Sequence, residues 1–468
     1  MNKRIIIKAW VVGMTVLGSF LTANGQTTSG VKIHSKTFTL QQVLDSAKAN
    51  NIGIRNARRD IGVAVEQKKE AFTNFFPNVS ATGMWFNANR PMATMDLDLA
   101  GSIPPALGTA LAQALPPEAL VELGSPMSME MMKNGTIASV SAIQPVFAGG
   151  QIVNGNRLAK VGENAARLKV MMSEDEVERT TENYFWQIVT LEEKMQTVLA
   201  VEKWLADIGK DVDVAVRAGV AMRNDLLQVQ LRQNEVESQK LKLKNGIEIL
   251  KLLLAQQCGL KDTAFVLSYD ATEVISPLAL KTDHQAALAN TPEYRLLNIQ
   301  VEAAKLKKKM AVGENMPSIA VGAGYNYHNL LGNDQKFAMV FATVSVPISA
   351  WWGGSHAIKR RQIEEMKAVD MLDENSQLLK IKMQKGWNDV VEAYQQLDIA
   401  QRSIEQATEN LRLNQDFYKA GTSSMSDLLE AQTLYQQALD KRTDAYAEYQ
   451  NKILEYKQAT HTGTTASR

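Results

Sequence analysis

The chain has 468 residues, and its 51 Lys and Arg are balanced by 50 Asp and Glu, which gives a formal net charge of +1. A chain with so little net charge has no global field to attract nucleic acid, so the composition argues against a nucleic-acid-binding protein. The single cysteine, Cys258, excludes an intrachain disulfide.

The first 25 residues have the pattern of a secretory signal peptide. Lys3 and Arg4 precede an apolar run that ends at Leu21, and small residues follow up to Gly25. Because the run is short for a membrane span, we predict a cleaved signal peptide over residues 1–25, with a retained anchor as the alternative. No later stretch reaches the ~18 consecutive apolar residues of a transmembrane helix, so the exported chain would enter a membrane only as a β-barrel.

Two long stretches without proline predict very long helices. Proline is absent between Pro145 and Pro277 and again after Pro347. Since an interior proline interrupts a helix, each stretch can hold a helix of ~100 Å. Apolar residues that recur every seven positions predict supercoiled packing. They are Val177, Tyr184, Leu191, Val198, Leu205 and Val212, then Met383, Val390, Leu397, Ile404, Leu411 and Tyr418.

An Ala-Gly pair interrupts each long helical stretch. Ala218 and Gly219 lie in the first stretch, and Ala420 and Gly421 lie in the second. Helical sequence resumes after both pairs. We therefore predict two antiparallel helical hairpins, over residues 150–257 and 354–459.

Four further segments are rich in β-branched, aromatic and small residues, which predicts strands. They cover about residues 78–90, 135–147, 318–330 and 336–348. In the third, Ile319, Val321 and Tyr325 alternate with small or polar residues. This period of two fits a membrane-barrel strand, and a half-buried strand in a soluble protein is the alternative.

The same plan occurs twice along the chain. The sequence AGVAMRNDLLQVQ begins at Ala218, and AGTSSMSDLLEAQ begins 202 residues later at Ala420. We predict an internal duplication, with a first repeat over residues 36–257 and a second over 292–460. Residues 258–291 form the linker. An insert near residues 91–134 separates the strands of the first repeat, and we predict that it is a loop.

Neither half is complete by itself. Four strands are too few to close a barrel, which needs about eight, and the heptad seams leave apolar helix faces uncovered. Three copies around an axis would pool about twelve strands. The fold class that follows is mainly α with a membrane β-barrel, in which a 12-stranded trimeric barrel continues as an α-helical tunnel.

These features together resemble the TolC-like outer-membrane efflux and secretion channels. The resemblance rests on the duplication, the strand exits QPVFAGG and VPISAWWGG, and the two Ala-Gly turns followed by Asp-Leu-Leu. It implies a homotrimer in the outer membrane of a Gram-negative bacterium, contacting its lipid, with a periplasmic helical tunnel and an equatorial linker. It also implies that the hairpin tips at Ala218-Gly219 and Ala420-Gly421 dock on a periplasmic adaptor bound to an inner-membrane pump. The channel would be the exit duct of a tripartite efflux or type I secretion system.

The resemblance places an acidic entrance ring at Asp427 and Glu430. Residues three apart share one helix face, and threefold symmetry would gather six carboxylates into a mouth that attracts cations. The alternative is that these acids only cap the helix start and complement its dipole.

The resemblance also implies gate contacts at Asp225 and Tyr418, for which a core position of Tyr418 is the alternative. The gate arginine of the family is absent here, because Ser423 occupies its position. Arg223 on the other tip is a candidate replacement.

The insert contains four methionines, Met127, Met129, Met131 and Met132, in the sequence PMSMEMMKN. Clustered thioethers suit Cu(I), but no His or Cys accompanies them, and methionine filling gaps in an apolar loop or short helix is the favoured interpretation. No catalytic motif, phosphate loop or metal-ligand spacing of histidines occurs, so we expect neither enzymatic activity nor a cofactor. A secreted trimeric coiled-coil adhesin or stalk is the competing hypothesis, because it would also explain the export signal and the heptads.

Overall fold

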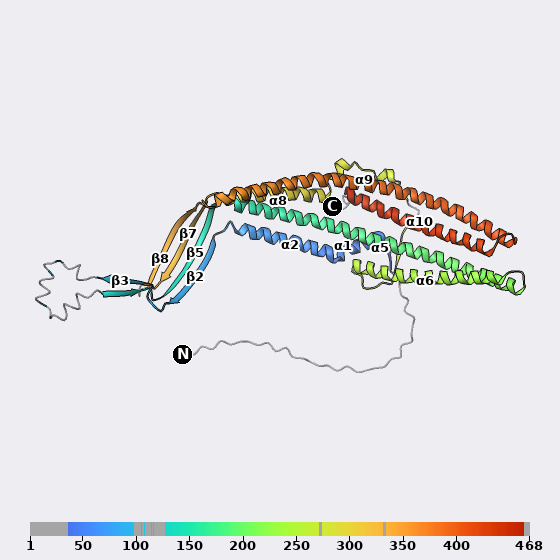
Figure 1. The fold of residues 1–468 in the computed structure, drawn as a ribbon, viewed down its shortest axis with the longest axis horizontal. Helices are drawn as coiled ribbons and strands as arrows, with labels where there is room; N and C mark the ends of the chain where they lie inside the picture. Colours follow the sequence, from blue (N-terminus) through green and yellow to red (C-terminus); the bar gives the residue numbers. More distant parts are fainter. Residues whose placement is uncertain are drawn as a thin grey trace, which may run out of the picture.

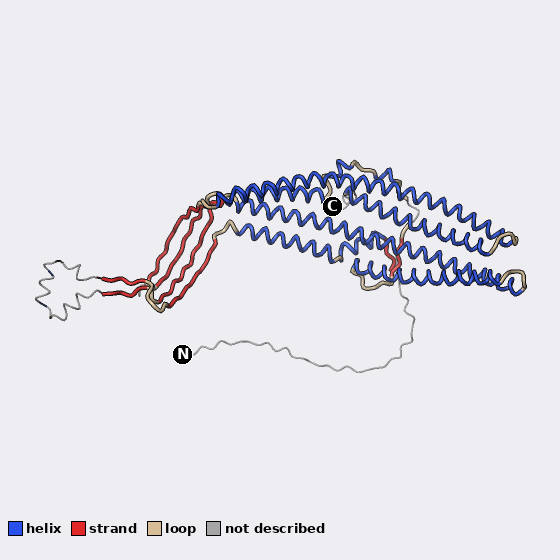
Figure 2. Tube along the Cα trace, viewed as in Figure 1, coloured by secondary structure: helices blue, strands red, loops and turns tan. Residues whose placement is uncertain are grey.

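The computed structural model describes residues 36–97, 127–270, 274–330 and 334–462, with a few isolated residues between 104 and 116. The predicted signal peptide lies outside this part of the chain. The molecule is elongated, with strands at one end, long helices running away from them, and two helix-to-helix turns at the far end (Figure 1). It is mostly helical with a smaller set of mainly antiparallel strands, as the sequence predicts at this coarse level (Figure 2).

Four antiparallel strands form the sheet at one end, in the order β2-β5-β7-β8. Their bounds are β2 Asn78–Asn87, β5 Asn134–Ala148, β7 Ser318–His328 and β8 Gln335–Ser345. Each begins within one residue of its predicted start, and three of them end two or three residues early. Because β2 and β8 are edges with no neighbour in the described chain, the sheet is open on both sides.

The two faces of this sheet differ in chemistry. Side chains of paired residues share a face, and most of the exposed β-branched side chains lie on one of them, called the apolar face below, while Met84, Ile143, Phe337 and Met339 are exposed on the other. It carries Val140, Ile319, Val321, Tyr325, Val340 and Val344. On the other face, Thr82 Oγ1 and Ser139 Oγ lie 2.7 Å apart across β2 and β5. There Phe341 of β8 lies against Gly322 of β7, where a Cβ atom would be only 2.4 Å from the ring.

Six long helices continue from the sheet. Their bounds are α2 Ile52–Thr73, α5 Gln151–Arg217, α6 Arg223–Cys258, α8 Pro292–Glu314, α9 Ala350–Lys419 and α10 Met425–Thr460. α5 with α6, and α9 with α10, form the two hairpins. α2 packs on α5, α5 on α8 and α8 on α9, which repeats the order of the strands to which these helices connect. Sheet and helices therefore form one continuous wall.

The heptad positions explain why such long helices are stable. Val198, Leu205 and Val212 of α5 are buried, as are Met383 and Val390 of α9. A helix of this length gains its stability from burying such a seam rather than from its own propensity. None of the described helices has the length and apolar character of a membrane-spanning helix.

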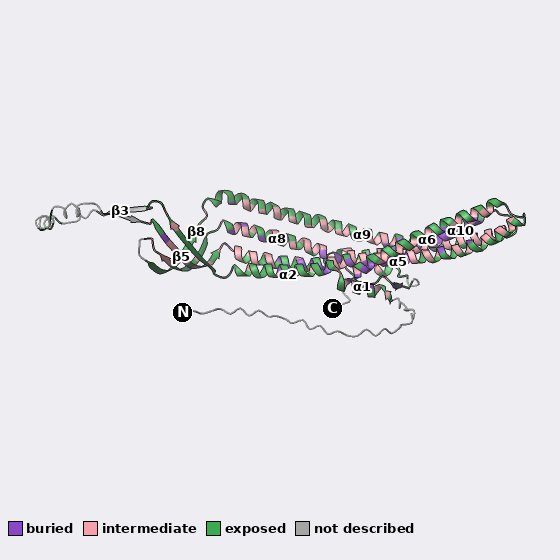
Figure 3. Cartoon of the chain, turned by 90° about the horizontal axis from the view of Figure 1, so that it is seen from below, coloured by how far each residue is buried: buried purple, intermediate pink, exposed green. Residues whose placement is uncertain are grey.

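Shorter elements surround the middle of the rod. They are β1 Lys36–Thr39, α1 Leu40–Asn50, β6 Phe265–Ser268, the 3-10 helix η1 Pro277–Leu280 and α7 His284–Leu288. β1 pairs in parallel with β6. The largest core lies here, and it contains Trp186, Tyr446, Tyr449 and Tyr456, while the sheet and outer helix faces are largely exposed (Figure 3). Trp186 packs edge-on against Tyr446 with ring centroids 5.5 Å apart.

The insert between β2 and β5 contains more structure than the predicted loop. β3 Ala93–Leu97 pairs antiparallel with β4 Met127–Met131 and forms a two-stranded ribbon. The sequence MSMEM alternates apolar and polar residues, which is the period of a strand. The prediction of a plain loop was therefore incomplete.

Candidate functional site

The two hairpin tips lie together at the end of the rod opposite the sheet (Figure 1). The first tip consists of residues 218–222, between α5 and α6, and the second of residues 420–424, between α9 and α10. Both Ala-Gly pairs therefore occupy the reversals that the sequence predicts.

Each tip begins with the same helix-ending motif. Gly219 has φ +75°, its amide donates to Val216 O at 3.1 Å, and the Val220 amide donates to Ala215 O at 3.0 Å. In the second tip Gly421 has φ +73°. There the bonds run from Gly421 to Tyr418 O at 3.0 Å and from Thr422 to Phe417 O at 2.9 Å. This is the Schellman pattern, in which a left-handed residue returns two amides to the last helical turn, and glycine adopts that conformation without strain.

An aspartate starts the helix after each tip. The Asp225 carboxylate accepts the Met222 amide at 3.1 Å. The Asp427 carboxylate accepts the Ser424 amide at 3.0 Å, and the Asp427 amide donates to Ser424 Oγ at 3.2 Å. Both aspartates therefore satisfy amides that a helix start would otherwise leave free. This explains why Asp-Leu-Leu recurs.

The second tip stabilises the ionised form of the Asp427 side chain. Hydrogen bonds from the Ser424 side chain and amide, and then from the Ser423 hydroxyl, hold the pKa of Asp427 below its usual value. Ser423, which stands at the position of the family's arginine, thus binds the carboxylate at 3.1 Å. Glu430 lies one turn further along α10 and is exposed. The capping role of Asp427 is present in the single chain, and the entrance ring stays a prediction.

The two tips are joined by one apolar cluster, called the tip cluster below. Its buried residues are Val198, Val201, Leu205, Val212, Val229, Val236, Met425 and Leu428, drawn from α5, α6 and α10. Tyr418 of α9 packs against it while partly buried. Burial, and then the charges of Asp225 and Asp211, raise the pKa of the Tyr418 hydroxyl, so it stays protonated and able to donate. Tyr418 and Asp225 therefore lie in one neighbourhood, and Tyr418 is also part of the core.

Polar contacts between the hairpins were not predicted. Arg232 Nη2 of α6 donates to Gln436 Oε1 of α10 at 2.9 Å, and Gln436 Nε2 donates to Gln239 Oε1 at 3.1 Å. The Arg232 side chain is only 12% exposed. Further along, Lys194 pairs with Asp444 at 2.7 Å. The sequence did contain one indication of this contact. Arg232 lies between Val229 and Val236, at a position of the heptad pattern that is normally apolar.

Arg223, the candidate replacement for the gate arginine, has a different environment. It is exposed at the first turn of α6, and within the described chain it forms neither an ion pair nor a hydrogen bond. The guanidinium that links the two hairpins is that of Arg232.

The remaining predicted site residues lie at the other end of the molecule. Met127, Met129 and Met131 belong to β4, and Met132 follows it with φ +60°. The described residues hold no group of three or more His, Cys, Asp or Glu side chains arranged for a metal ion. Binding of copper by the methionines stays untested.

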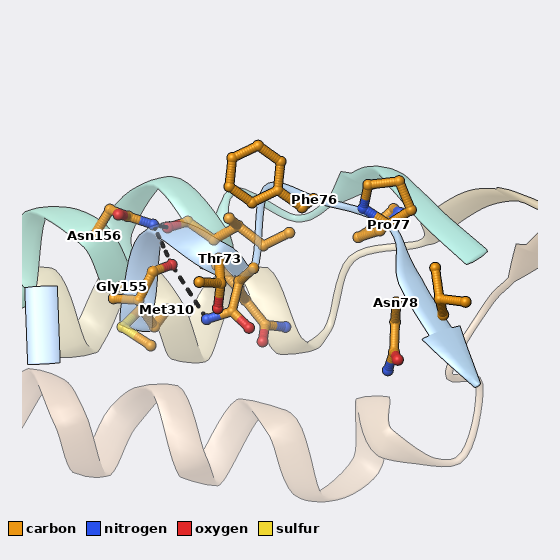
Figure 4. Close-up of a pocket in the computed structure, with 13 residues that line it drawn as sticks. Thr73, Phe76, Pro77, Asn78, Gly155, Asn156 and Met310 are labelled. Atoms are coloured by element: carbon orange, nitrogen blue, oxygen red, sulfur yellow. Dashed lines mark hydrogen bonds between the residues drawn. The ribbon is translucent and has the colours of Figure 1, made fainter. Parts of the chain in front are cut away.

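A cavity of about 720 Å³ lies where α2 meets β2 (Figure 4). Thr73, Phe76, Pro77 and Met310 line it, and none of its lining residues is titratable. Asn156 Nδ2 donates to Ala71 O at 2.8 Å and thereby joins α5 to α2. The cavity therefore has no acidic or basic side chain for acid–base catalysis.

Comparison with known proteins supports the predicted family. Residues 284–460, which include the second tip, match the family model of the outer membrane efflux proteins. No curated protein sequence matches the chain significantly.

Similar solved structures cover nearly the whole chain. The CmeC outer membrane channel of Campylobacter jejuni is 15% identical with a TM-score of 0.72, over 92% of this chain and 87% of that one. The outer membrane protein VceC of Vibrio cholerae is 12% identical with a TM-score of 0.69, over 90% and 95%. The open state of the MtrE outer membrane channel of Neisseria gonorrhoeae is 15% identical with a TM-score of 0.68, over 90% and 88%. At these identities the likeness establishes a shared fold.

Proposed function

We propose that this chain, whose residues 284–460 match the family model of the outer membrane efflux proteins, is one subunit of a homotrimeric outer-membrane channel. The channel would be the exit duct of a tripartite efflux or type I secretion system in a Gram-negative bacterium. Transport through it needs no chemistry by the chain itself, so the energy would come from an inner-membrane pump.

The observation that carries this proposal is the open wall formed by sheet and helices. β2 and β8 present unpaired edges, and four helices leave the sheet in the order of its strands. Three copies placed edge to edge would pair every edge and give about twelve strands, enough for a barrel with an aqueous lumen. The helices of the three walls would then close into a tunnel, and the two halves of each chain would contribute equivalent parts of it.

The side chains fit this arrangement. Val340 is 86% exposed and Val344 64% exposed on the apolar face. Such exposure is costly in water and favourable against lipid tails. The opposite face, with the Thr82 and Ser139 hydroxyl groups, would line the lumen. A coiled-coil adhesin or stalk would give this two-faced sheet no role.

The far end of the tunnel would be its periplasmic entrance. Each chain contributes two tips, so three chains would place six tips around it. We propose that Ala218-Gly219 and Ala420-Gly421 mark the surface that docks on a periplasmic adaptor protein. In the same assembly Asp427 and Glu430 would form the acidic ring, and Asp225 with Tyr418 would contribute to the closed gate.

Ion conductance tests the proposal. The purified protein, added to a planar lipid bilayer, should produce discrete conductance steps, because a closed barrel encloses a continuous water path. The protein should also resist unfolding in cold detergent and migrate differently after heating. A folded protein that binds bilayers without conducting would contradict the channel and favour an adhesin.

A further inference from the structure

A second concave site lies outside the hairpin tips, beside the junction of α2 with β2. Its volume is about 460 Å³, and its walls come from the end of α2 and the start of α5. Phe72, Phe75 and Val153 form an apolar wall, and these three side chains are 53%, 39% and 44% exposed. Phe72 and Phe75 pack with ring centroids 5.5 Å apart. The wall is a preformed aromatic surface that water covers in the isolated chain.

Four cations surround this wall, and no acid lines the pocket. Two of them are already paired: Lys68 with Glu163 at 3.0 Å, and Lys69 with Glu66 at 2.8 Å. Arg157 and Lys160 of α5 are exposed, and within the described chain neither has an ion-pair or hydrogen-bond partner. The pocket therefore combines an apolar wall with two uncommitted positive charges one helical turn apart.

The pocket lies level with the end of the sheet, on the side of its apolar face. Gln144 of β5 shares that face with Val140, and its Nε2 donates to Phe75 O at 3.0 Å. At the junction of β8 with α9, on the opposite edge of the sheet, Trp351 and Trp352 are 50% and 76% exposed. Exposed aromatic residues at one level of a membrane protein mark the boundary of the bilayer, and cations just beyond them meet lipid head groups.

From this geometry we infer a binding site for an anionic phospholipid, with an acyl chain against Phe72, Phe75 and Val153 and the phosphate at Arg157 and Lys160. The site rests on the proposed function in one respect, that the sheet spans a membrane. A purely apolar ligand would leave the two cations without a partner, and a purely anionic ligand would leave the apolar wall uncovered. The bound lipid would anchor α2 to α5 at the point where the barrel becomes the tunnel.

The second half of the chain supplies a natural comparison. Lys308 pairs with Glu365 at 3.0 Å, just as Lys68 pairs with Glu163. However, Val312 and Asn315 stand at the positions, 240 residues on, that correspond to Phe72 and Phe75. Lys359 and Arg360 of α9 are exposed cations, and Lys359 stands 202 residues after Arg157, at the corresponding position of the second repeat. Replacing Lys359 and Arg360 therefore removes the same charge as replacing Arg157 and Lys160, at a place where no comparable pocket is expected.

Native mass spectrometry of the detergent-purified protein tests the inference. Dioleoyl phosphatidylglycerol and dioleoyl phosphatidylcholine are titrated onto wild type, onto Arg157→Gln with Lys160→Gln, and onto the control Lys359→Gln with Arg360→Gln. Wild type should prefer phosphatidylglycerol, the Arg157 and Lys160 variant should bind it about tenfold more weakly, and the control should bind as wild type does. Glycerol phosphate, which lacks acyl chains, should compete poorly.

Three results would overturn the site: equal binding of both lipids by wild type, equal loss in both variants, or full competition by glycerol phosphate. Conductance of the same preparations separates this inference from the proposed function. Conducting protein without lipid selectivity refutes only the lipid site, whereas selective lipid binding by protein that never conducts refutes the channel.

Discussion

The first hairpin tip and the second have the same backbone hydrogen bonds but different surfaces. Gly219 and Gly421 both take left-handed conformations, and Asp225 and Asp427 both cap the helix that follows. Between these fixed points the first tip carries Val220 and Met222, which are 80% and 74% exposed, whereas the second carries Thr422, Ser423 and Ser424.

The comparison distinguishes the residues that the turn itself requires from those that are free to serve a binding surface. Chain reversal requires the glycine and the aspartate, so these recur. The residues between them are free to differ, and exposed apolar side chains at a turn are typical of a binding surface. We therefore expect the first tip to supply apolar contacts to the adaptor and the second tip to supply the charged constriction.

The largest expected effect follows from removing the apolar surface of the first tip. Val220→Ser with Met222→Ser should weaken binding to the adaptor of the same transport system about tenfold or more, because buried apolar anchors dominate such interfaces. Biolayer interferometry with the purified channel measures this affinity. The matched change at the second tip, Thr422→Ala with Ser423→Ala, should have a much smaller effect. An equal loss of adaptor affinity in both variants would show that the two tips do not differ in their contribution to docking.

The contact between the hairpins gives the next prediction. Replacing Arg232 with Met removes its hydrogen bond to Gln436, and bonds of charged groups contribute about 1.5–3 kcal/mol. If this contact holds the closed state, the resting conductance should rise about tenfold. Arg223→Gln is the control and should leave conductance unchanged. If conductance rose in Arg223→Gln and stayed unchanged in Arg232→Met, Arg223 would instead be the arginine that holds the gate.

The acidic residues of the second tip should control selectivity. Asp427→Asn with Glu430→Gln should reduce the preference for cations and weaken block by a trivalent cation, since charges at a narrow opening focus the field. Single-channel reversal potentials in a salt gradient measure the preference. Asp225→Asn should instead raise resting conductance and leave selectivity intact. If the double variant kept the selectivity of the wild type, these acids would serve only the helix start and would not form an entrance ring.

The pH dependence of this selectivity has a definite direction. Hydrogen bonds in the folded chain lower the pKa of Asp427 below 3.8, so the folded state favours its ionised form. Its charge and its contribution to the helix cap should be fully present above pH 3.8 and should be lost as the pH falls through the lowered value. Loss of the Asp427 contribution already near pH 5 would contradict this sign.

The smallest effect should be the same in both tips. A Cβ atom at Gly219 or Gly421 would meet no atom within 4 Å, so alanine costs only the strain of positive φ, about 1 kcal/mol. Hydrogen exchange of the tip amides should therefore accelerate equally in Gly219→Ala and Gly421→Ala. A larger effect at one tip would reveal a difference between the two backbones.

Local sequence rules predict much of this molecule. The proline-free stretches and the Ala-Gly pairs indicate where the helices run and reverse, because these residues act on their own backbone. The alternation in MSMEM was available too, but its methionines were interpreted as filling gaps in an apolar loop or short helix, and the β3–β4 ribbon was missed.

The contacts between helices were harder to predict. A heptad identifies the buried face of a helix but not which residue of a neighbour it meets, so the bond between Arg232 and Gln436 required the structure. The proximity of Tyr418 to Asp225 came from the family resemblance and not from either local sequence. The acidic ring depends on other copies of the chain, and a single chain shows only the cap at Asp427.

The central claim is that three copies close the open wall. Native mass spectrometry of the detergent-extracted protein tests it most directly, because it counts the chains in each particle. The account predicts particles of three chains, since the edges β2 and β8 must find partners. A stable monomer that keeps its full β-sheet content would contradict it.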